Sequence, residues 1–313
     1  MKLSASVPCL IAASAITFGS LGLTTAAQAS SPKAAAVPYS IRLEDQFLAE
    51  LLYLPVKFVP TAPSTPTTTT TTTSTTTTTT TTLPTSTTSS TTTTSTTLPP
   101  TTTSTTTTTT TLPPKKRTVS RTKIVPGSFV WRFNSLPGAL KSQWRVGTNN
   151  VVLQGALMRF QDLHGFATTG SMDGTTWRAL VSAVLGHHND PSTYNYVYVS
   201  KSLPETVKLY QNGHVTFTTL ANTGVSDAPT ENGTYPVYLR FTVTTMSGTL
   251  PDGSTYDDTG IPWVSYFHGG DALHGFIRSS YGVPQSLGCV EMPFGDAAHL
   301  WPHTPIGTLV TVQ

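Results

Sequence analysis

A threonine-rich tract in the first half of the chain limits what the rest can fold into. Residues 61–115 are mostly Thr with some Ser, interrupted at Leu83-Pro84, Leu98-Pro99-Pro100 and Leu112-Pro113-Pro114. Such a segment has too little apolar surface to offset the conformational entropy lost on ordering. It predicts a disordered linker whose hydroxyl side chains are candidates for O-glycosylation. Any core must therefore form from the segments on either side.

The first residues have the features of a secretory signal peptide. Lys2 supplies a positive charge, an apolar stretch follows from Val7 to Leu23, and Ala27-Gln28-Ala29 offers a cleavage site. Ser and Thr interrupt the apolar stretch, which is too short for a good transmembrane helix. The sequence predicts a signal peptide over residues 1–29 and an exported mature protein without a membrane span.

If the protein is exported, cleavage of the signal peptide decides which of the two cysteines remains. Cys9 lies in the expected signal peptide, so Cys289 is the thiol that the mature chain would keep. A lone thiol in an exported protein has no disulfide partner and is prone to oxidation. Such a residue is expected where it has a chemical function. Cys289 is therefore a candidate nucleophile.

A short segment before the tract has the pattern of a helix. Its apolar residues recur at helical spacing over residues 41–52, and Pro55 ends the pattern. Residues 52–58 then have an extended pattern. We expect this piece, within residues 30–60, to be too small to fold alone and to dock on a downstream segment.

Helical apolar spacing returns after the tract, over residues 130–185. One face of the first predicted helix is formed by Leu153, Ala156, Leu157, Phe160 and Leu163. A turn at Gly170–Gly174 precedes a second helix, which starts at Thr176. The pattern predicts a small helical domain over residues 116–189.

Two runs in this domain resemble the peptidoglycan-binding domain found in many wall enzymes. They are Gly155–Phe166, which contains a Phe-Gln pair, and Thr175–Leu180. The resemblance implies a three-helix bundle in which Phe160 and Trp177 are core residues rather than ligand contacts. Leu52–Pro55 is similar to a helix end in the same family, which implies that the Thr tract is an insertion inside one split domain.

Charge divides the chain near the same boundary. Residues 115–189 carry ten Lys or Arg against two acidic residues, whereas residues 190–313 carry four against ten, although the net charge is only +3. A balance of +8 beside one of −6 predicts units with different electrostatic partners. Because an exported protein rarely meets nucleic acid, an anionic wall polymer is the expected partner of the basic part. Ordinary solvated surfaces are the alternative.

The apolar period changes to two beyond Tyr194. The runs that alternate in the manner of strands are 196–199, 206–210, 214–218, 235–241 and 308–312. Asn212-Gly213 predicts a hairpin turn between two of them, and one helical stretch covers residues 296–301. Residues 190–313 are expected to form a compact, mostly-β domain, and the whole chain an α+β multidomain protein.

Cys289 lies in a segment suited to nucleophilic chemistry, fifteen residues after His274. A cysteine nucleophile needs a nearby base that favours the thiolate and donors aimed at the developing oxyanion. Gly288 lets the backbone turn sharply, so the amides of Leu287, Gly288 and Cys289 could converge on one oxygen. His268 and His274 share a Gly-rich segment and are both candidate bases.

The stretch from Tyr196 to Val312 resembles the L,D-transpeptidase catalytic domain of the YkuD type. Its signature is His-Gly, a spacer, then Ser/Thr-His-Gly-Cys and a hydrophobic residue. His274-Gly275 and Ser286–Val290 fill those places, and Asn222-Thr223-Gly224 is a further match.

The resemblance implies roles for individual residues. Cys289 would be the nucleophile and His274 the base that later returns the proton, while the amides of Gly288 and Leu287 would stabilise the oxyanion. Substrate contacts are implied for His268, Gly275, Ser286 and Tyr266.

Two positions depart from the signature. Leu287 replaces the histidine that precedes Gly-Cys, and Glu291 stands where Arg or Asn is usual. Because the upstream histidine is the main base of the family, Leu287 puts the rate in doubt more than the reaction type. His268 also stands where a small polar residue is expected.

The leading interpretation is an exported cysteine L,D-transpeptidase that forms 3→3 cross-links in peptidoglycan. Water as the acceptor would make it an L,D-carboxypeptidase, and loss of activity would leave a wall-binding structural protein. Carbapenem β-lactams are the expected inhibitors, and neither a cofactor nor a metal site is expected. The sequence leaves open the acceptor, stem residue three and the oligomeric state.

Overall fold

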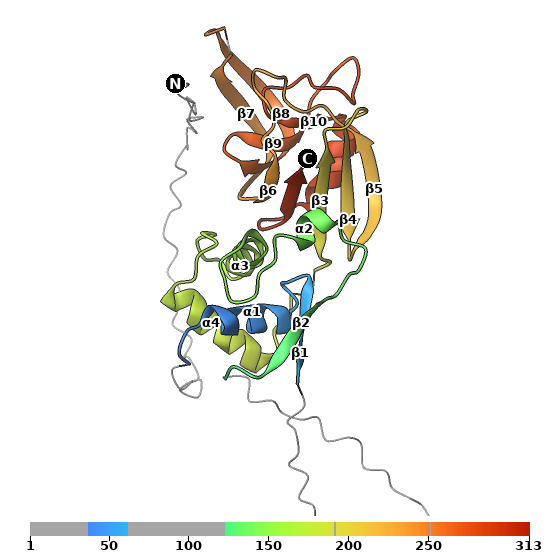
Figure 1. Cartoon of the computed structure of the whole chain (residues 1–313). Coiled ribbons are helices and arrows are strands. Elements are labelled where there is room, and N and C mark those ends of the chain that lie inside the picture. The colour runs from blue at the N-terminus through green and yellow to red at the C-terminus, as the bar shows by residue number, and fades with distance from the viewer. Residues whose placement is uncertain (1–36, 62–122, 191, 251) are drawn as a thin grey trace, which may run out of the picture. The chain divides into compact units, whose positions relative to one another are not determined.

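The computed structural model describes residues 37–61, 123–190, 192–250 and 252–313 (Figure 1). The expected signal peptide with Cys9, and nearly all of the Thr tract, lie outside these residues. The described residues on the two sides of the tract belong to one compact unit. Within that unit a helical part, which includes the segment before the tract, precedes a β part.

Among the described residues, the helical part has four helices and two strands. The helices are α1 (Ile41–Glu50), α2 (Gly138–Lys141), α3 (Val151–Leu163) and α4 (Gly174–Gly186), and the strands are β1 (Val56–Pro60) and β2 (Gly127–Trp131). Side chains of Ser40, Asn150 and Asp173 accept hydrogen bonds from first-turn amides of α1, α3 and α4. These are typical N-caps and explain where the three helices begin.

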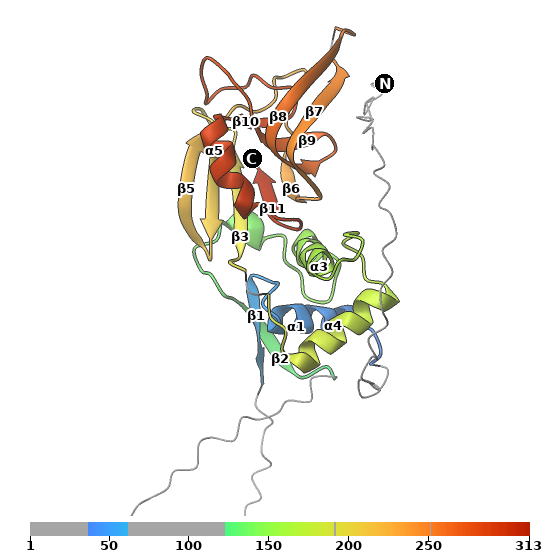
Figure 2. The same cartoon turned by 180° about the vertical axis from the view of Figure 1, so that it is seen from behind.

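Strand pairing joins the segments on the two sides of the tract. β1 and β2 are antiparallel, with Val56 opposite Trp131 and Pro60 opposite Gly127. Helix α1 also contacts α3 and α4 (Figures 1 and 2). The piece before the tract therefore docks on the piece after it. Membership of this part in the peptidoglycan-binding family stays a prediction.

Aromatic residues occupy the centre of the helical core. Phe160 and Trp177 are both buried there, as the sequence predicts. The Trp177 ring stacks on Phe47 of α1 with ring centroids 5.5 Å apart. Its indole nitrogen donates a hydrogen bond of 2.7 Å to the carbonyl oxygen of Val37. Residues before the tract thus complete the core that α3 and α4 begin.

The expectation of helical structure from residue 130 onward is wrong at its start. Val130 lies in β2, and the first helix after it begins at Gly138. The partner of β2 is β1, on the other side of the tract. A local window of sequence does not contain the pairing that stabilises this strand, so its pattern alone is ambiguous.

The β part has two sheets, which confirms a mostly-β domain. Their strand orders are β5-β4-β3-β11-β6 and β10-β9-β8-β7. The strands are β3 (Asn195–Ser200), β4 (Thr206–Gln211), β5 (His214–Leu220), β6 (Gly233–Pro236), β7 (Leu239–Thr249), β8 (Thr255–His268), β9 (Asp271–Gly275), β10 (Val290–Met292) and β11 (Leu309–Val312). Helix α5 (Phe294–Leu300) packs on β8 and β9 and continues into a 3-10 turn at Trp301–His303.

Alternate residues of both sheets build the core of the β part. The buried side chains include Val197, Val199, Val207, Leu209, Leu273, Val290, Met292, Leu300, Val310 and Val312. This is the period of two expected for half-buried strands. Asn212 and Gly213, with φ of 49° and 85°, form the turn between β4 and β5 that their sequence predicts.

Residues 235–241, expected to form one strand, belong to two. β6 pairs with β11, whereas β7 pairs with β8 in the other sheet. Between them the amide of Val237 donates to Thr308 and the amide of Tyr238 donates to Tyr266. The chain crosses from one sheet to the other at these two residues.

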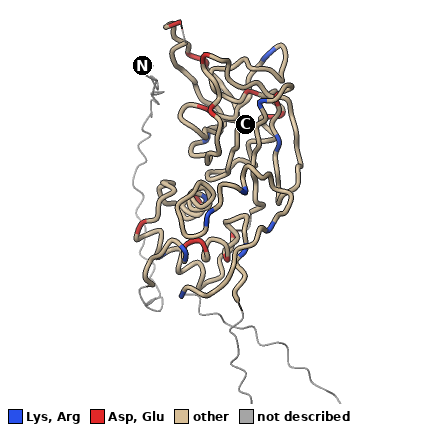
Figure 3. Tube along the Cα trace, viewed as in Figure 1, with Lys and Arg blue, Asp and Glu red and all other residues tan. Residues whose placement is uncertain are grey.

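The charge difference between the two parts is smaller within the described residues. Lys115, Lys116, Arg117 and Arg121 lie outside them. The described helical part carries eight Lys or Arg against five Asp or Glu, while residues 190–313 carry four against ten (Figure 3). The sign of the difference is retained.

Candidate active site

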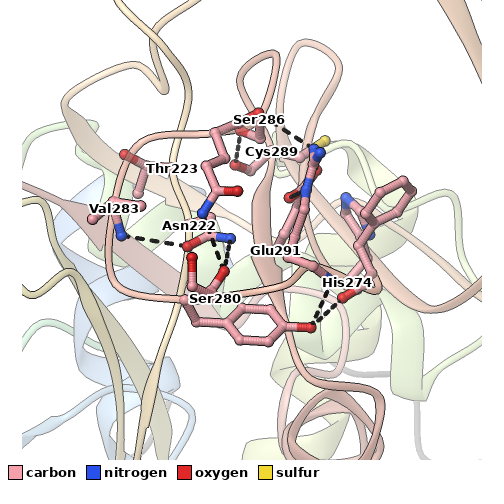
Figure 4. A network of polar contacts seen from close by, with 12 residues as sticks. Asn222, Thr223, His274, Ser280, Val283, Ser286, Cys289 and Glu291 are labelled. Carbon is pink, nitrogen blue, oxygen red and sulfur yellow. Dashed lines mark hydrogen bonds and ion pairs between the residues drawn. The ribbon is translucent and has the colours of Figure 1, made fainter.

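The register of two parallel strands places Cys289 and His274 on the same side of the sheet. In the β9–β10 pair, Leu273 is opposite Val290 and His274 is opposite Glu291. Leu273 and Val290 face the core of the β part. The next residues along the two strands, His274 and Glu291, therefore face the opposite side. Cys289 stands two positions before Glu291 and therefore lies on the same side as His274 (Figure 4).

The thiol is partly exposed at the edge of a smaller apolar cluster. Cys289 packs against this cluster, which contains Tyr266 and Ala272, and its exposure is intermediate. Its Sγ lies 3.8 Å from the carbonyl oxygen of Gly270, in the turn between β8 and β9. A nucleophile must be reached by its substrate, and this position permits it.

His274 is suited to accept a proton. Its side chain is buried, with the residue 3% exposed. Nδ1 lies 3.0 Å from the carbonyl oxygen of Gly275, so the neutral ring carries its proton on Nδ1 and has Nε2 as the acceptor. Burial lowers the pKa of His274, while the bond to Gly275 and the Glu291 carboxylate oppose that change. A neutral imidazole of this kind can act as a general base.

The segment that carries the nucleophile has an internal hydrogen-bond network. Gly288 has a φ of 114°, and Asp271 Oδ1 occupies the place that a β-carbon would take, so glycine is required. Ser286 Oγ donates to the carbonyl oxygen of Cys289 at 2.6 Å and accepts from the Gly288 amide at 3.3 Å. The Gly288 amide thus bonds within the loop, and the buried Ser286 holds the loop in place. The expected roles of the Gly288 amide as an oxyanion donor and of Ser286 as a substrate contact stay predictions.

Leu287 stands at the position of the missing histidine and is 40% exposed. Within the described part of the chain, its amide donates to no backbone acceptor. The predicted oxyanion role of this amide is therefore compatible with the geometry, as are the predicted roles of Cys289 and His274. All three stay predictions.

His268 lies beside the nucleophile loop, at the end of β8. Its Nδ1 is 3.7 Å from Asp271 Oδ2, and its ring lies against Tyr235 with centroids 4.2 Å apart. Burial raises the pKa of Asp271 to about 6, and the nearby His268 opposes that rise. The His268 side chain is 40% exposed. A side chain this exposed could be reached by substrate, and its expected contact with substrate stays a prediction.

Two further residues expected to contact substrate are buried against neighbouring elements. Tyr266 is 7% exposed, and its ring is in edge-to-face contact with Phe241. Gly275 faces α5, where an added β-carbon would meet Phe294 at 2.9 Å. Both positions are buried because alternate residues of β8 and β9 face neighbouring elements. Their expected contacts with substrate stay predictions.

Asn222 anchors the loop between β9 and β10, a role that its match to the family motif did not reveal. Its main chain exchanges two hydrogen bonds of 2.9 Å with the main chain of Glu291. Its side chain accepts from the amides of Gly282 and Val283 and donates to the carbonyl oxygen of Ser280 (Figure 4). A fully buried amide with these partners fixes the loop rigidly.

Glu291 has a partner that the sequence pattern did not identify. Arg278 Nε and Nη2 donate to its two carboxylate oxygens at 2.7 and 2.8 Å. This two-pronged geometry is among the stronger ion pairs that proteins form. The acidic residue at position 291, unusual for the family signature, was the signal that could have pointed to a compensating cation.

In the part of the chain that the structure describes, no group of three or more His, Cys, Asp or Glu side chains could hold a metal ion. The rings of His299 and His303 lie 5.9 Å apart, with Phe217 and Gln211 as further neighbours. No described helix has the length and apolar character needed to cross a membrane.

One family model matches the segment that contains this site. Residues 194–312 match the L,D-transpeptidase catalytic domain (YkuD). The comparison with curated proteins found no match.

The solved structures that match part of this chain include several L,D-transpeptidases. The L,D-transpeptidase from Mycobacterium smegmatis is 20% identical with a TM-score of 0.35, and the match covers 39% of this chain and 59% of that one. The catalytic domain from E. faecium L,D-transpeptidase is 23% identical with a TM-score of 0.35, covering 40% and 100%. A structure of that domain acylated by ertapenem gives the same values. This chain thus spans about three fifths of the M. smegmatis protein.

Proposed function

We propose that this chain is a cysteine L,D-transpeptidase that forms 3→3 cross-links between peptidoglycan stem peptides. The observation that carries the proposal is the placement of His274 on β9 and of Cys289 directly before its partner strand β10. That pair lies inside the segment that matches the L,D-transpeptidase catalytic domain. The partly exposed thiol and the buried, neutral imidazole have the properties that a nucleophile and its base require.

The first half-reaction forms a thioester. His274 Nε2 takes the proton from Cys289 Sγ, and the thiolate attacks the carbonyl carbon of stem residue three. Amides of Leu287, Gly288 and Cys289 are the proposed donors to the resulting oxyanion, and one such donor contributes about 3 kcal/mol in comparable sites. Collapse breaks the bond to the terminal D-Ala, whose nitrogen takes the proton from His274.

The second half-reaction transfers the acyl group. The amine of a second stem attacks the thioester carbon and loses a proton to His274. The carbon–sulfur bond breaks, the new amide remains between the two stems, and the Cys289 thiolate recovers the proton from His274. Water in place of the amine would give hydrolysis, which is L,D-carboxypeptidase activity.

The proposal extends to where the protein works. Export is supported by the signal-like residues 1–29, and attachment to the wall by the resemblance of the helical part to peptidoglycan-binding domains. The positive balance of that part fits an anionic polymer. Holding the catalytic domain on its polymer would raise the local substrate concentration.

Incubation of the full chain with a carbapenem tests the nucleophile. The intact mass should rise by one inhibitor per chain, and peptide mapping should place the adduct on Cys289. The variant Cys289→Ala should stay unmodified while keeping the wild-type circular dichroism spectrum. A folded wild-type protein that forms no adduct would point to the structural-protein alternative.

Products formed from purified tetrapeptide stems identify the acceptor. A cross-linked dimer that has lost one D-Ala supports transpeptidation, whereas tripeptide alone supports the L,D-carboxypeptidase. An unchanged product profile in Cys289→Ala would overturn both enzymatic assignments.

A further inference from the structure

Glu291 occupies a position from which it can influence both reacting groups. It is opposite His274 in the parallel register and two positions after Cys289. The residue is 5% exposed, so its carboxylate is largely removed from water. An ionised carboxylate in such a place is destabilising unless it is paired and hydrogen-bonded.

The surrounding contacts fix this carboxylate in one place. Arg278 meets both of its oxygens, at 2.7 and 2.8 Å. Arg278 is itself held by a 3.3 Å hydrogen bond to the carbonyl oxygen of Gln285 and by the face of the Phe276 ring. The main chain of Glu291 is paired with Asn222. The side chain and the backbone of Glu291 are thus both fixed, whereas the side chains of a surface ion pair are usually held loosely.

The charged groups that face His274 come from three elements. Glu291 comes from β10, Arg278 from the loop after β9 and Asp258 from β8. Glu291 and Asp258 favour the protonated imidazole, Arg278 disfavours it, and burial of the ring disfavours it most. Of the three side chains, Glu291 has the largest effect.

We propose that Glu291, held in place by Arg278, is a positioning residue for His274, and that its carboxylate stabilises the imidazolium formed when His274 takes the proton from Cys289. The inference rests on the proposed function, because it concerns the same site. No covalent step is added, since the proton moves only between Sγ and Nε2. The guanidinium limits the effect of the carboxylate and prevents it from standing unpaired in the protein interior.

Titration of the His274 ring in the full chain tests this directly. Ring signals from histidine-labelled protein can be assigned by comparison with His274→Gln. Glu291→Gln keeps the shape of the side chain but removes its charge, so the pKa of His274 should fall. The double variant Glu291→Gln/Arg278→Gln removes the opposing cation as well, and the pKa should return part of the way.

The rate at which iodoacetamide alkylates Cys289 provides a second measurement. Peptide mapping separates this thiol from Cys9. At neutral pH, alkylation in Glu291→Gln should be about three- to tenfold slower because a weaker base forms less thiolate. The double variant should again recover part of the loss. Asp227→Asn, which removes one exposed negative charge from the β part, should leave both readings unchanged.

A purely structural ion pair predicts a different pattern. The double variant would then show a His274 pKa and a Cys289 alkylation rate at least as far from wild type as those of Glu291→Gln. Removing the Arg278 charge would not restore either value. Either result, or an unchanged His274 titration in Glu291→Gln, would overturn the inference. If Glu291→Gln does not fold, Glu291→Asp can replace it, because this variant keeps the charge but moves it away from His274. The pKa of His274 should then fall by less than in Glu291→Gln. An unchanged pKa would count against the inference. Neither reading uses a stem peptide or a β-lactam, so this inference and the proposed function can fail separately.

Discussion

At the scale of single residues, the nucleophile loop has little freedom to change. Gly288 combines a positive φ with the close approach of Asp271, so a side chain there meets both backbone strain and a carboxylate. Ser286 adds two hydrogen bonds that fix the carbonyl of Cys289 and the amide of Gly288. The direction of the thiol is therefore set by the backbone of the loop and not by the cysteine alone.

We predict that Gly288→Ala lowers the rate of acylation by a carbapenem at least tenfold. The left-handed backbone costs about 1–2 kcal/mol with a side chain, and Asp271 must also move. Gly253→Ala is the matched control, because Gly253 has a φ of 89° and open space around it. Time-resolved mass spectrometry should show normal acylation in the control. Equal rates in the two variants would mean that the loop geometry is dispensable.

We also predict that the two neighbouring histidines are not equivalent. His274→Ala should reduce acylation by roughly 10²–10⁴-fold, the usual contribution of a general base. His268→Ala should have a much smaller effect, because its ring lies against Tyr235 and Asp271 at the turn. Single-turnover acylation rates give the ranking. The reverse order would place the base at His268.

At the scale of elements, the sequence predicts structure where the pairing partner is near. Strands β3, β4 and β5 follow from their period of two and the Asn212-Gly213 turn. The β1–β2 pair does not, since its strands are separated by the Thr tract. For the same reason Cys289 and His274 were identifiable from a local motif, whereas the partnership of Arg278 with Glu291 depends on how a loop folds back.

Helix α1 carries two buried carboxyl groups that should make stability depend on pH. Burial raises the pKa of Glu44 to about 7 and that of Asp45 to about 6. Glu44 accepts a hydrogen bond from the Tyr39 hydroxyl at 2.9 Å, and Asp45 accepts one from the Gly147 amide at 2.6 Å. Both bonds favour the charged carboxylate and offset only part of the rise that burial causes. The folded protein thus binds protons more tightly than the unfolded chain does. This contribution to stability is complete below the ordinary carboxyl pKa and is lost as pH rises through about 7.

We predict that the free energy of unfolding falls by about 2 kcal/mol more in the wild type than in Glu44→Gln as pH rises from about 5 to 8. The variant should be the more stable of the two at the higher pH, because it buries no charge. Denaturant titrations at several pH values measure this difference. Parallel pH profiles for wild type and Glu44→Gln would exclude Glu44 as the source.

At the scale of the whole molecule, positive and negative balances lie in different parts of the chain. The described helical part has an excess of three positive charges, from eight Lys or Arg and five Asp or Glu (Figure 3). The β part has an excess of six negative charges, from ten acidic and four basic side chains. An anionic wall polymer would attract the first and repel the second. Attachment to the wall should therefore depend on basic residues of the helical part.

We predict that removing two charges from the helical part weakens binding to purified sacculi, whereas removing two from the β part does not. Arg145 and Arg178 are exposed on the helical part, and Lys201 and Lys208 lie in the β part. All variants carry Cys289→Ala, so that acyl transfer cannot retain the protein. In low salt, Arg145→Gln/Arg178→Gln should bind about threefold less tightly for each charge removed, and Lys201→Gln/Lys208→Gln should bind like the parent. The difference should shrink near 0.15 M salt, where the Debye length is about 8 Å. Equal losses from the two pairs would show that the attraction is spread over the whole chain, and the helical part would lose its assignment as the anchor.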